Sequence, residues 1–109
     1  MNQTDGVVVI ATLEAEEGKE TQVEEVLRTA VSAVHTEPGC ERYALHRSPQ
    51  SSTTFVMVEK WASGPALGAH GKGAALAELR AALDGLLAKL MDVQVLTPLP
   101  DGDRQLGAL

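Results

Sequence analysis

The sequence predicts an α+β domain of the ferredoxin-like βαββαβ type, and three patterns support this prediction. Runs rich in β-branched residues lie near the two ends of the chain, and two alternating polar–apolar segments form a hairpin between them. Two stretches with an apolar residue at every third or fourth position separate these strands. The expected elements in chain order are strand 7–13, helix 23–34, strand 40–47, strand 54–61, a short helix 63–69, helix 74–90 and strand 93–96.

The first strand and the first helix are defined by their apolar residues. The run from Val7 to Leu13 opens with four consecutive β-branched residues, which suits a strand buried on both faces. The next segment has helical spacing, and Pro38 and Gly39 end it. Its apolar stripe consists of Val23, Val26, Leu27, Ala30, Val31 and Val34.

A polar turn at 48–52 joins the two strands of the expected hairpin. In the first of these strands, Tyr43 and Leu45 share one face, because successive side chains of a strand point to opposite sides. One face of the second strand carries Phe55, Met57, Glu59 and Trp61.

The last third of the chain reads as a short helix, a long helix and a strand. Ser63 is expected to cap the short helix, which runs through Ala69. Two glycines interrupt the pattern, and a leucine stripe then predicts a longer helix from Ala74 to Leu90.

Length and composition limit the classes of function. We expect one domain over residues 1–109, with an ordered core at about 6–98 and a tail at 101–109. The net charge is −6 and the basic residues are not clustered, so neither nucleic acid nor a membrane surface is an expected partner. Cys40 is the only cysteine, which excludes an intramolecular disulfide and indicates a reducing, cytoplasmic location.

The expected topology leaves one surface without a cover. Right-handed crossovers place both helices on the same face of a four-stranded antiparallel sheet. The first, third and fourth strands nevertheless carry apolar residues on both faces. Because burying apolar surface is worth about 25 cal/mol per Å², we expect a homodimer that joins two sheets face to face.

Three segments carry a resemblance to a known family: E-P-G-C at 37–40, V-E-K-W-A-S at 58–63 and A-L-G-A-H at 66–70. Over residues 7–98 the chain resembles the antibiotic biosynthesis monooxygenase domain family, dimeric α/β barrels that include quinol monooxygenases. The resemblance implies a monooxygenase that acts on a small aromatic, quinol or polyketide-type compound with O₂. Related barrels also include isomerases and haem-degrading enzymes, so the resemblance is less specific for the reaction than for the fold.

Three residues are candidates for catalysis. Trp61 could line the pocket and donate its indole N–H to a substrate oxygen, or it could plug the core. His70 could remove a phenolic proton, or bond a carbonyl at a helix end. Arg80 could stabilise an anionic intermediate, as the similar E-L-R segment of relatives implies, or pair with Asp84 one turn on.

Four further residues are candidates for substrate binding: Tyr43, Met57, Glu59 and Leu67. A buried Glu59 would be an acid or base with a raised pKa, although an ion pair with an arginine is the alternative that we favour. The aromatic-polyketide oxygenases that this chain resembles have Asn and Tyr where it has Met57 and Leu67, which predicts a less polar pocket.

The sequence contains no metal-binding spacing of histidines and no glycine-rich phosphate loop, so no metal or cofactor is expected. The leading hypothesis is therefore a cofactor-independent monooxygenase in which the deprotonated substrate reduces O₂. An isomerase or lyase with the same acid–base residues is one alternative. A non-enzymatic dimeric barrel that binds a small molecule is another.

Overall fold

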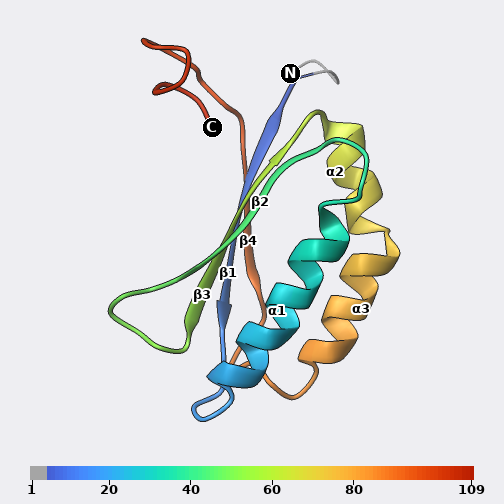
Figure 1. Ribbon diagram of the computed structural model, residues 1–109, viewed down its shortest axis with the longest axis vertical. Coiled ribbons are helices and arrows are strands. Elements are labelled where there is room, and N and C mark those ends of the chain that lie inside the picture. The colour runs from blue at the N-terminus through green and yellow to red at the C-terminus, as the bar shows by residue number, and fades with distance from the viewer. Residues whose placement is uncertain (1–4) are drawn as a thin grey trace.

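The computed structural model describes residues 5–109 and contains a four-stranded antiparallel sheet in the order β2-β3-β1-β4. All three helices lie on one face of this sheet (Figure 1), which confirms the predicted α+β ferredoxin-like fold. The elements are β1 Val7–Glu14, α1 Glu20–Val34, β2 Cys40–Arg47, β3 Thr54–Trp61, α2 Gly64–Gly71, α3 Ala74–Leu83 and β4 Asp92–Leu96.

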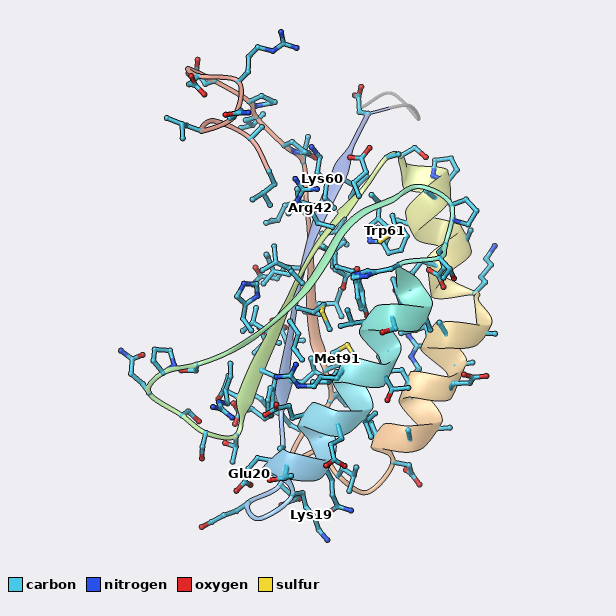
Figure 2. All side chains as sticks on the ribbon, viewed as in Figure 1. Lys19, Glu20, Arg42, Lys60, Trp61 and Met91 are labelled. Carbon is cyan, nitrogen blue, oxygen red and sulfur yellow. The ribbon has the colours of Figure 1, made fainter. Side chains whose placement is uncertain are left out.

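The two central strands provide most of the core. β1 and β3 pair along their full length, with Val9 opposite Glu59 and Ala11 opposite Met57. Alternate residues of β3 are buried, and these are the four that the sequence assigned to one face. Figure 2 shows the alternation directly, because Trp61 points into the layer between sheet and helices while Lys60 points to the opposite side.

Helix α1 packs against the sheet through the stripe that its spacing predicts. Val23, Leu27, Ala30 and Val34 are all buried, and they recur at intervals of three or four residues. At the other end of the helical layer, Ser63 caps α2 by accepting a hydrogen bond from the backbone N–H of Ala66, as expected.

The expected long helix from Ala74 to Leu90 is wrong in its second half. α3 ends at Leu83, because Asp84 adopts an extended ψ of 126° and Gly85 a left-handed φ of 78°. The next residues instead pair with the end of β1: the Ala88 N–H donates to the Glu14 carbonyl, and the Glu16 N–H to the Leu86 carbonyl, each at 2.8 Å. A run of leucines has the same hydrophobicity in both conformations, so its spacing did not reveal the change.

β4 lies at an edge of the sheet that the helices do not cover. All five of its residues are exposed, although Val93 and Val95 share the face on which the helices lie. Their side chains are 53% and 60% exposed. The helical layer is therefore open along the β4 side.

The opposite face of the sheet also remains uncovered at its centre. The register places Ile10, Val58 and Ala44 side by side across three strands on this face. After β4 the chain turns to this side of the sheet (Figure 1), and the Lys60 ammonium group donates to the Leu109 carbonyl. Within residues 5–109, no helix has the length and apolar character needed to span a membrane.

One turn residue fixes the approach of β2 to the helical layer. Gly39 has a φ of 83°, and a Cβ added to it would lie 2.6 Å from the Cβ of Ala66 in α2. Its carbonyl accepts a hydrogen bond of 2.8 Å from the Ala62 N–H, just after β3. Only glycine combines this backbone conformation with this close approach.

We therefore predict that Gly39→Ala lowers the free energy of unfolding by about 2–4 kcal/mol, from left-handed strain plus overpacking against Ala66. Gly18→Ala is the matched control, because Gly18 has a φ of 87° but no atom within 4 Å of an added Cβ. In Gly18→Ala, left-handed strain alone should then lower the free energy of unfolding by about 1 kcal/mol. Chemical denaturation of both variants measures the difference, and equal losses would contradict the proposed contact.

Candidate active site

A cavity of about 240 Å³ lies between the sheet and the helices, near the middle of the domain. Its walls are mainly apolar and come from all four strands and all three helices. The polar side chains that line it are Tyr43, Glu59, His70 and Arg80. An apolar pocket with a few converging polar groups is the usual form of a small-molecule site.

The structure brings six of the seven predicted site residues to the wall of this cavity. These are Tyr43, Met57, Glu59, Leu67, His70 and Arg80. Met57 and Leu67 contribute apolar wall, as their residue types predict. A role for any of the six in binding or catalysis remains a prediction.

Trp61 is the exception among the seven residues. It is completely buried and does not line the cavity. Its indole N–H donates a 2.9 Å hydrogen bond to Oε1 of Glu59. Of the two alternatives for Trp61, these contacts match a core plug, because a neighbouring side chain already accepts the N–H.

Glu59 is a buried carboxyl group on the central strand β3, with 4% of its surface exposed. The favoured alternative of an ion pair with an arginine is wrong: among residues 5–109, Glu59 takes part in no salt bridge and accepts from Trp61 instead. Burial raises the pKa of this carboxyl above its usual value, and this effect outweighs the opposing influence of the Trp61 hydrogen bond and the His70 charge. Glu59 is thus easier to protonate than an ordinary glutamate.

The imidazole ring of His70 is held on three sides. Its Nδ1 lies 2.7 Å from Oε1 of Glu37, a residue in the turn between α1 and β2. Its face stacks on Trp61 with the ring centroids 4.5 Å apart, and Tyr43 makes an edge contact at 5.6 Å. Only 6% of His70 is exposed, so the ring has little freedom to turn.

Glu37 is the residue of the site that the sequence did not single out. It belongs to the E-P-G-C segment, which carries the resemblance to the family. Nothing in the local sequence indicates that it reaches a histidine 33 positions further along the chain. The fold creates this contact by placing the α1–β2 turn beside the end of α2.

Tyr43 and Arg80 occupy different depths of the site. Tyr43 is buried, and burial together with the nearby charges of Glu59 and Glu37 raises the pKa of its phenol above the usual range. The phenol therefore stays protonated and is suited to donate a hydrogen bond. Arg80 is exposed at the mouth, and the expected pair with Asp84 does not form within the described chain.

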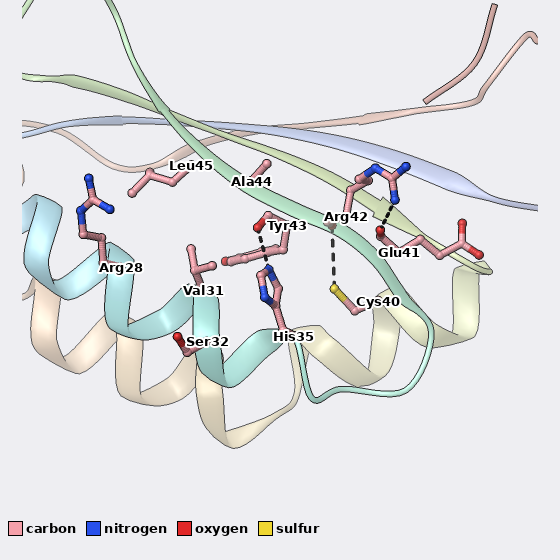
Figure 3. Close-up of a pocket in the computed structure, with 10 residues that line it drawn as sticks. All are labelled: Arg28, Val31, Ser32, His35, Cys40, Glu41, Arg42, Tyr43, Ala44 and Leu45. Atoms are coloured by element: carbon pink, nitrogen blue, oxygen red, sulfur yellow. Dashed lines mark hydrogen bonds between the residues drawn. The ribbon is translucent and has the colours of Figure 1, made fainter. Parts of the chain in front are cut away.

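A second hollow of about 770 Å³ lies outside the core, between α1 and the outer strand β2 (Figure 3). It is larger than the core cavity, but it is a surface groove without a buried acid–base pair. Cys40 borders it and is half-exposed, and partial burial together with three nearby carboxylates raises the pKa of its thiol. The thiol is consequently a weak nucleophile at neutral pH.

Side chains donate hydrogen bonds to three backbone carbonyl groups of β2. His35 donates from Nε2 to the Tyr43 carbonyl at 3.0 Å, and Arg42 donates to the Glu41 carbonyl at 2.8 Å (Figure 3). His46 similarly donates to the Ala44 carbonyl at 3.1 Å. The carbonyl groups of Tyr43 and Ala44 point to opposite edges of β2, so at least one of these contacts occupies an acceptor on the free edge of the strand.

The fold and the core cavity define a ferredoxin-like domain with a small-molecule pocket that contains a histidine and a protonatable carboxyl group. The chain belongs to the antibiotic biosynthesis monooxygenase family, whose sequence model matches residues 6–86. No curated protein matches the chain.

Solved structures show the same fold. The chain is similar to a Pseudomonas aeruginosa protein with 27% identity and a TM-score of 0.82, covering 91% of this chain and 99% of that one. A Mycobacterium tuberculosis protein has 26% identity and a TM-score of 0.83, with 91% and 100% covered. A Caulobacter crescentus protein, provisionally described as an antibiotic biosynthesis monooxygenase, has 28% identity and a TM-score of 0.82, with 89% and 92% covered.

We predict that Glu59→Gln becomes more stable relative to the wild type as the pH rises. Above the ordinary carboxyl pKa of 4.5, the unfolded chain releases the proton of this residue while the folded protein retains it. The folded state then binds more protons, so wild-type stability falls with increasing pH until the raised pKa is passed. The Gln variant lacks this contribution.

Urea denaturation of both proteins from pH 4 to pH 8 measures the effect. The two curves should run parallel below pH 4.5 and diverge above it. Glu25→Gln, at an exposed site on α1, is the matched control. A similar divergence in that variant would show that the effect does not originate at Glu59.

Proposed function

We propose that this protein is a cofactor-independent monooxygenase that oxidises a small aromatic or quinol-type compound with O₂. Family membership supports oxygenase chemistry in general. The observation that carries the proposal is that His70 and Glu59 both line a mainly apolar cavity. Such a cavity suits an aromatic ring, and the pair provides a proton acceptor and a proton donor.

In the proposed reaction, His70 removes a phenolic proton of the bound compound. The resulting anion is electron-rich and transfers electrons to O₂, so a peroxide forms on the ring carbon. Loss of water from this peroxide leaves a quinone, with one oxygen atom of O₂ in the product and the other in the water. Tyr43 and Glu59 would hold the substrate oxygens, and Arg80 at the mouth would stabilise the anion.

The size of the cavity limits the substrate. Its volume of about 240 Å³ lies below the range of about 300–1,000 Å³ that is typical for drug-sized ligands. A compound of one or two rings therefore suits the space better than a large polyketide.

We also propose that two copies associate through their open sheet faces. The centre of this face carries Ile10, Val58 and Ala44 in register, and an apolar patch of this kind favours burial. Association through the free edge of β2 is less favourable, because a side chain already occupies at least one carbonyl group on that edge.

An isomerase or lyase is the second candidate, since His70 and Glu59 could also move a proton between two atoms of one substrate. Both candidates use the same residues. They differ in whether O₂ is consumed.

We predict that the purified protein consumes O₂ with members of a panel of hydroquinones and anthrones, measured with an oxygen electrode. His70→Gln should lower kcat by about 10²–10⁴-fold, the usual contribution of a general base. His46→Gln, an exposed position on the other face of the sheet, should leave the rate unchanged. Absence of O₂ uptake with every compound would overturn the oxygenase proposal, and an isomerised product would favour the second candidate.

For the assembly, we predict that Val58→Glu converts a dimer into monomers, because the new charge would be buried between two sheets. Sedimentation equilibrium measures the change. Ser52→Glu, in the exposed turn before β3, adds the same charge outside the proposed interface and should remain dimeric. A monomeric wild type would contradict the proposed association.

A further inference from the structure

The two ring nitrogens of His70 have different surroundings. Nδ1 lies 2.7 Å from Oε1 of Glu37, a separation typical of a strong, charge-assisted hydrogen bond. A carboxylate only accepts hydrogen bonds, so the proton of a neutral His70 ring resides on Nδ1. Nε2 is then the unprotonated nitrogen.

Glu37 is itself well placed to hold this arrangement. The turn that carries it is closed by two backbone hydrogen bonds, from its own N–H to the Val34 carbonyl at 2.9 Å and from the Cys40 N–H to its carbonyl at 3.2 Å. Its second carboxylate oxygen lies beside Gly73, where an added Cβ would come within 3.3 Å. The carboxylate thus fits between His70 and the start of α3, whose positive helix end favours an anion.

Nε2 has no hydrogen-bond partner among residues 5–109. In the same part of the chain, no side-chain nitrogen or oxygen is both fully enclosed and without a partner, so Nε2 must retain some access. His70 lines the core cavity, so we infer that Nε2 is the ring nitrogen that a compound bound there would meet.

We propose that Glu37 is a positioning residue that keeps His70 in the Nδ1–H form, with Nε2 ready to accept a proton from the substrate. This inference rests on the proposed function for the identity of the substrate proton. When Nε2 accepts that proton, the ring becomes a cation, and the adjacent carboxylate stabilises it. Glu37 does not itself line the cavity and acts only through His70.

A purely structural role for Glu37 would look different in solution. A carboxylate that merely ties the α1–β2 turn to α2 would affect stability, whereas a positioning role requires in addition that loss of the carboxylate shifts the tautomer of His70 and lowers kcat. The tautomer of the ring is therefore the decisive measurement, and it requires no substrate.

The test is two-bond ¹H–¹⁵N NMR spectroscopy of histidine-labelled protein. The chain has three histidines, and the other two provide internal references. His35 donates from Nε2 to a carbonyl and His46 donates from Nδ1, so the two references report opposite tautomers. We expect the His70 pattern to match that of His46 in the wild type.

Glu37→Gln is the main variant. A glutamine side chain can donate as well as accept, so both tautomers of His70 should become populated while the His35 and His46 signals stay in place. Turnover with the hydroquinone panel should fall at least about tenfold in kcat with little change in KM. Glu37→Asp retains the carboxylate and should restore the Nδ1–H pattern and part of the rate.

The outcomes separate this inference from the proposed function. An Nε2–H pattern for His70 in the wild type, or an unchanged tautomer in Glu37→Gln, overturns the positioning role whatever the rate. The expected tautomer change in a protein that oxidises no compound of the panel supports the positioning role and leaves the oxygenase proposal without support.

Discussion

The burial of a carboxyl group on the central strand is the constraint on which the site depends. Glu59 lies on the inner face of β3, where a charged or unpaired polar group is costly. The indole N–H of Trp61 satisfies one of its oxygens, and Trp61 in turn provides the surface on which His70 stacks. Glu37 then completes this series of contacts through its hydrogen bond with Nδ1 of His70. Four residues from one strand, a turn and a helix are thus tied into one unit, because none can move without exposing another.

Much of the fold could be predicted, because it depends on local alternation and helical spacing. The inner face of β3 and the buried stripe of α1 follow from the order of apolar residues alone. The end of α3 could not be predicted in this way. Its leucine run continues past Leu83, and the break depends on Gly85 and on backbone pairing with β1, a contact between segments distant in sequence.

The same distinction, between local sequence patterns and contacts that only the fold creates, applies to the residues of the site. The residue types that line the cavity were predictable, since strand faces and family segments placed them there. The hydrogen-bond partners of these residues were predictable only in part. Trp61 and Glu59 are two residues apart on one face of β3. The alternation of strand side chains therefore places them side by side, which is a local indication of their hydrogen bond. The contact of Glu37 with His70 had no such signal, because only the packing of the α1–β2 turn against α2 creates it.

The occupied carbonyl groups of β2 have a consequence for assembly beyond a pair of subunits. A sheet with two free edges is a template for open-ended growth, in which each added copy exposes a new edge. Either His35 or His46 blocks a position on the free edge of β2 with a side chain of the same chain, because the carbonyl groups of Tyr43 and Ala44 point to opposite edges. Fibre formation through this strand would first have to break that bond, which protects a small domain with a thin core at high concentration.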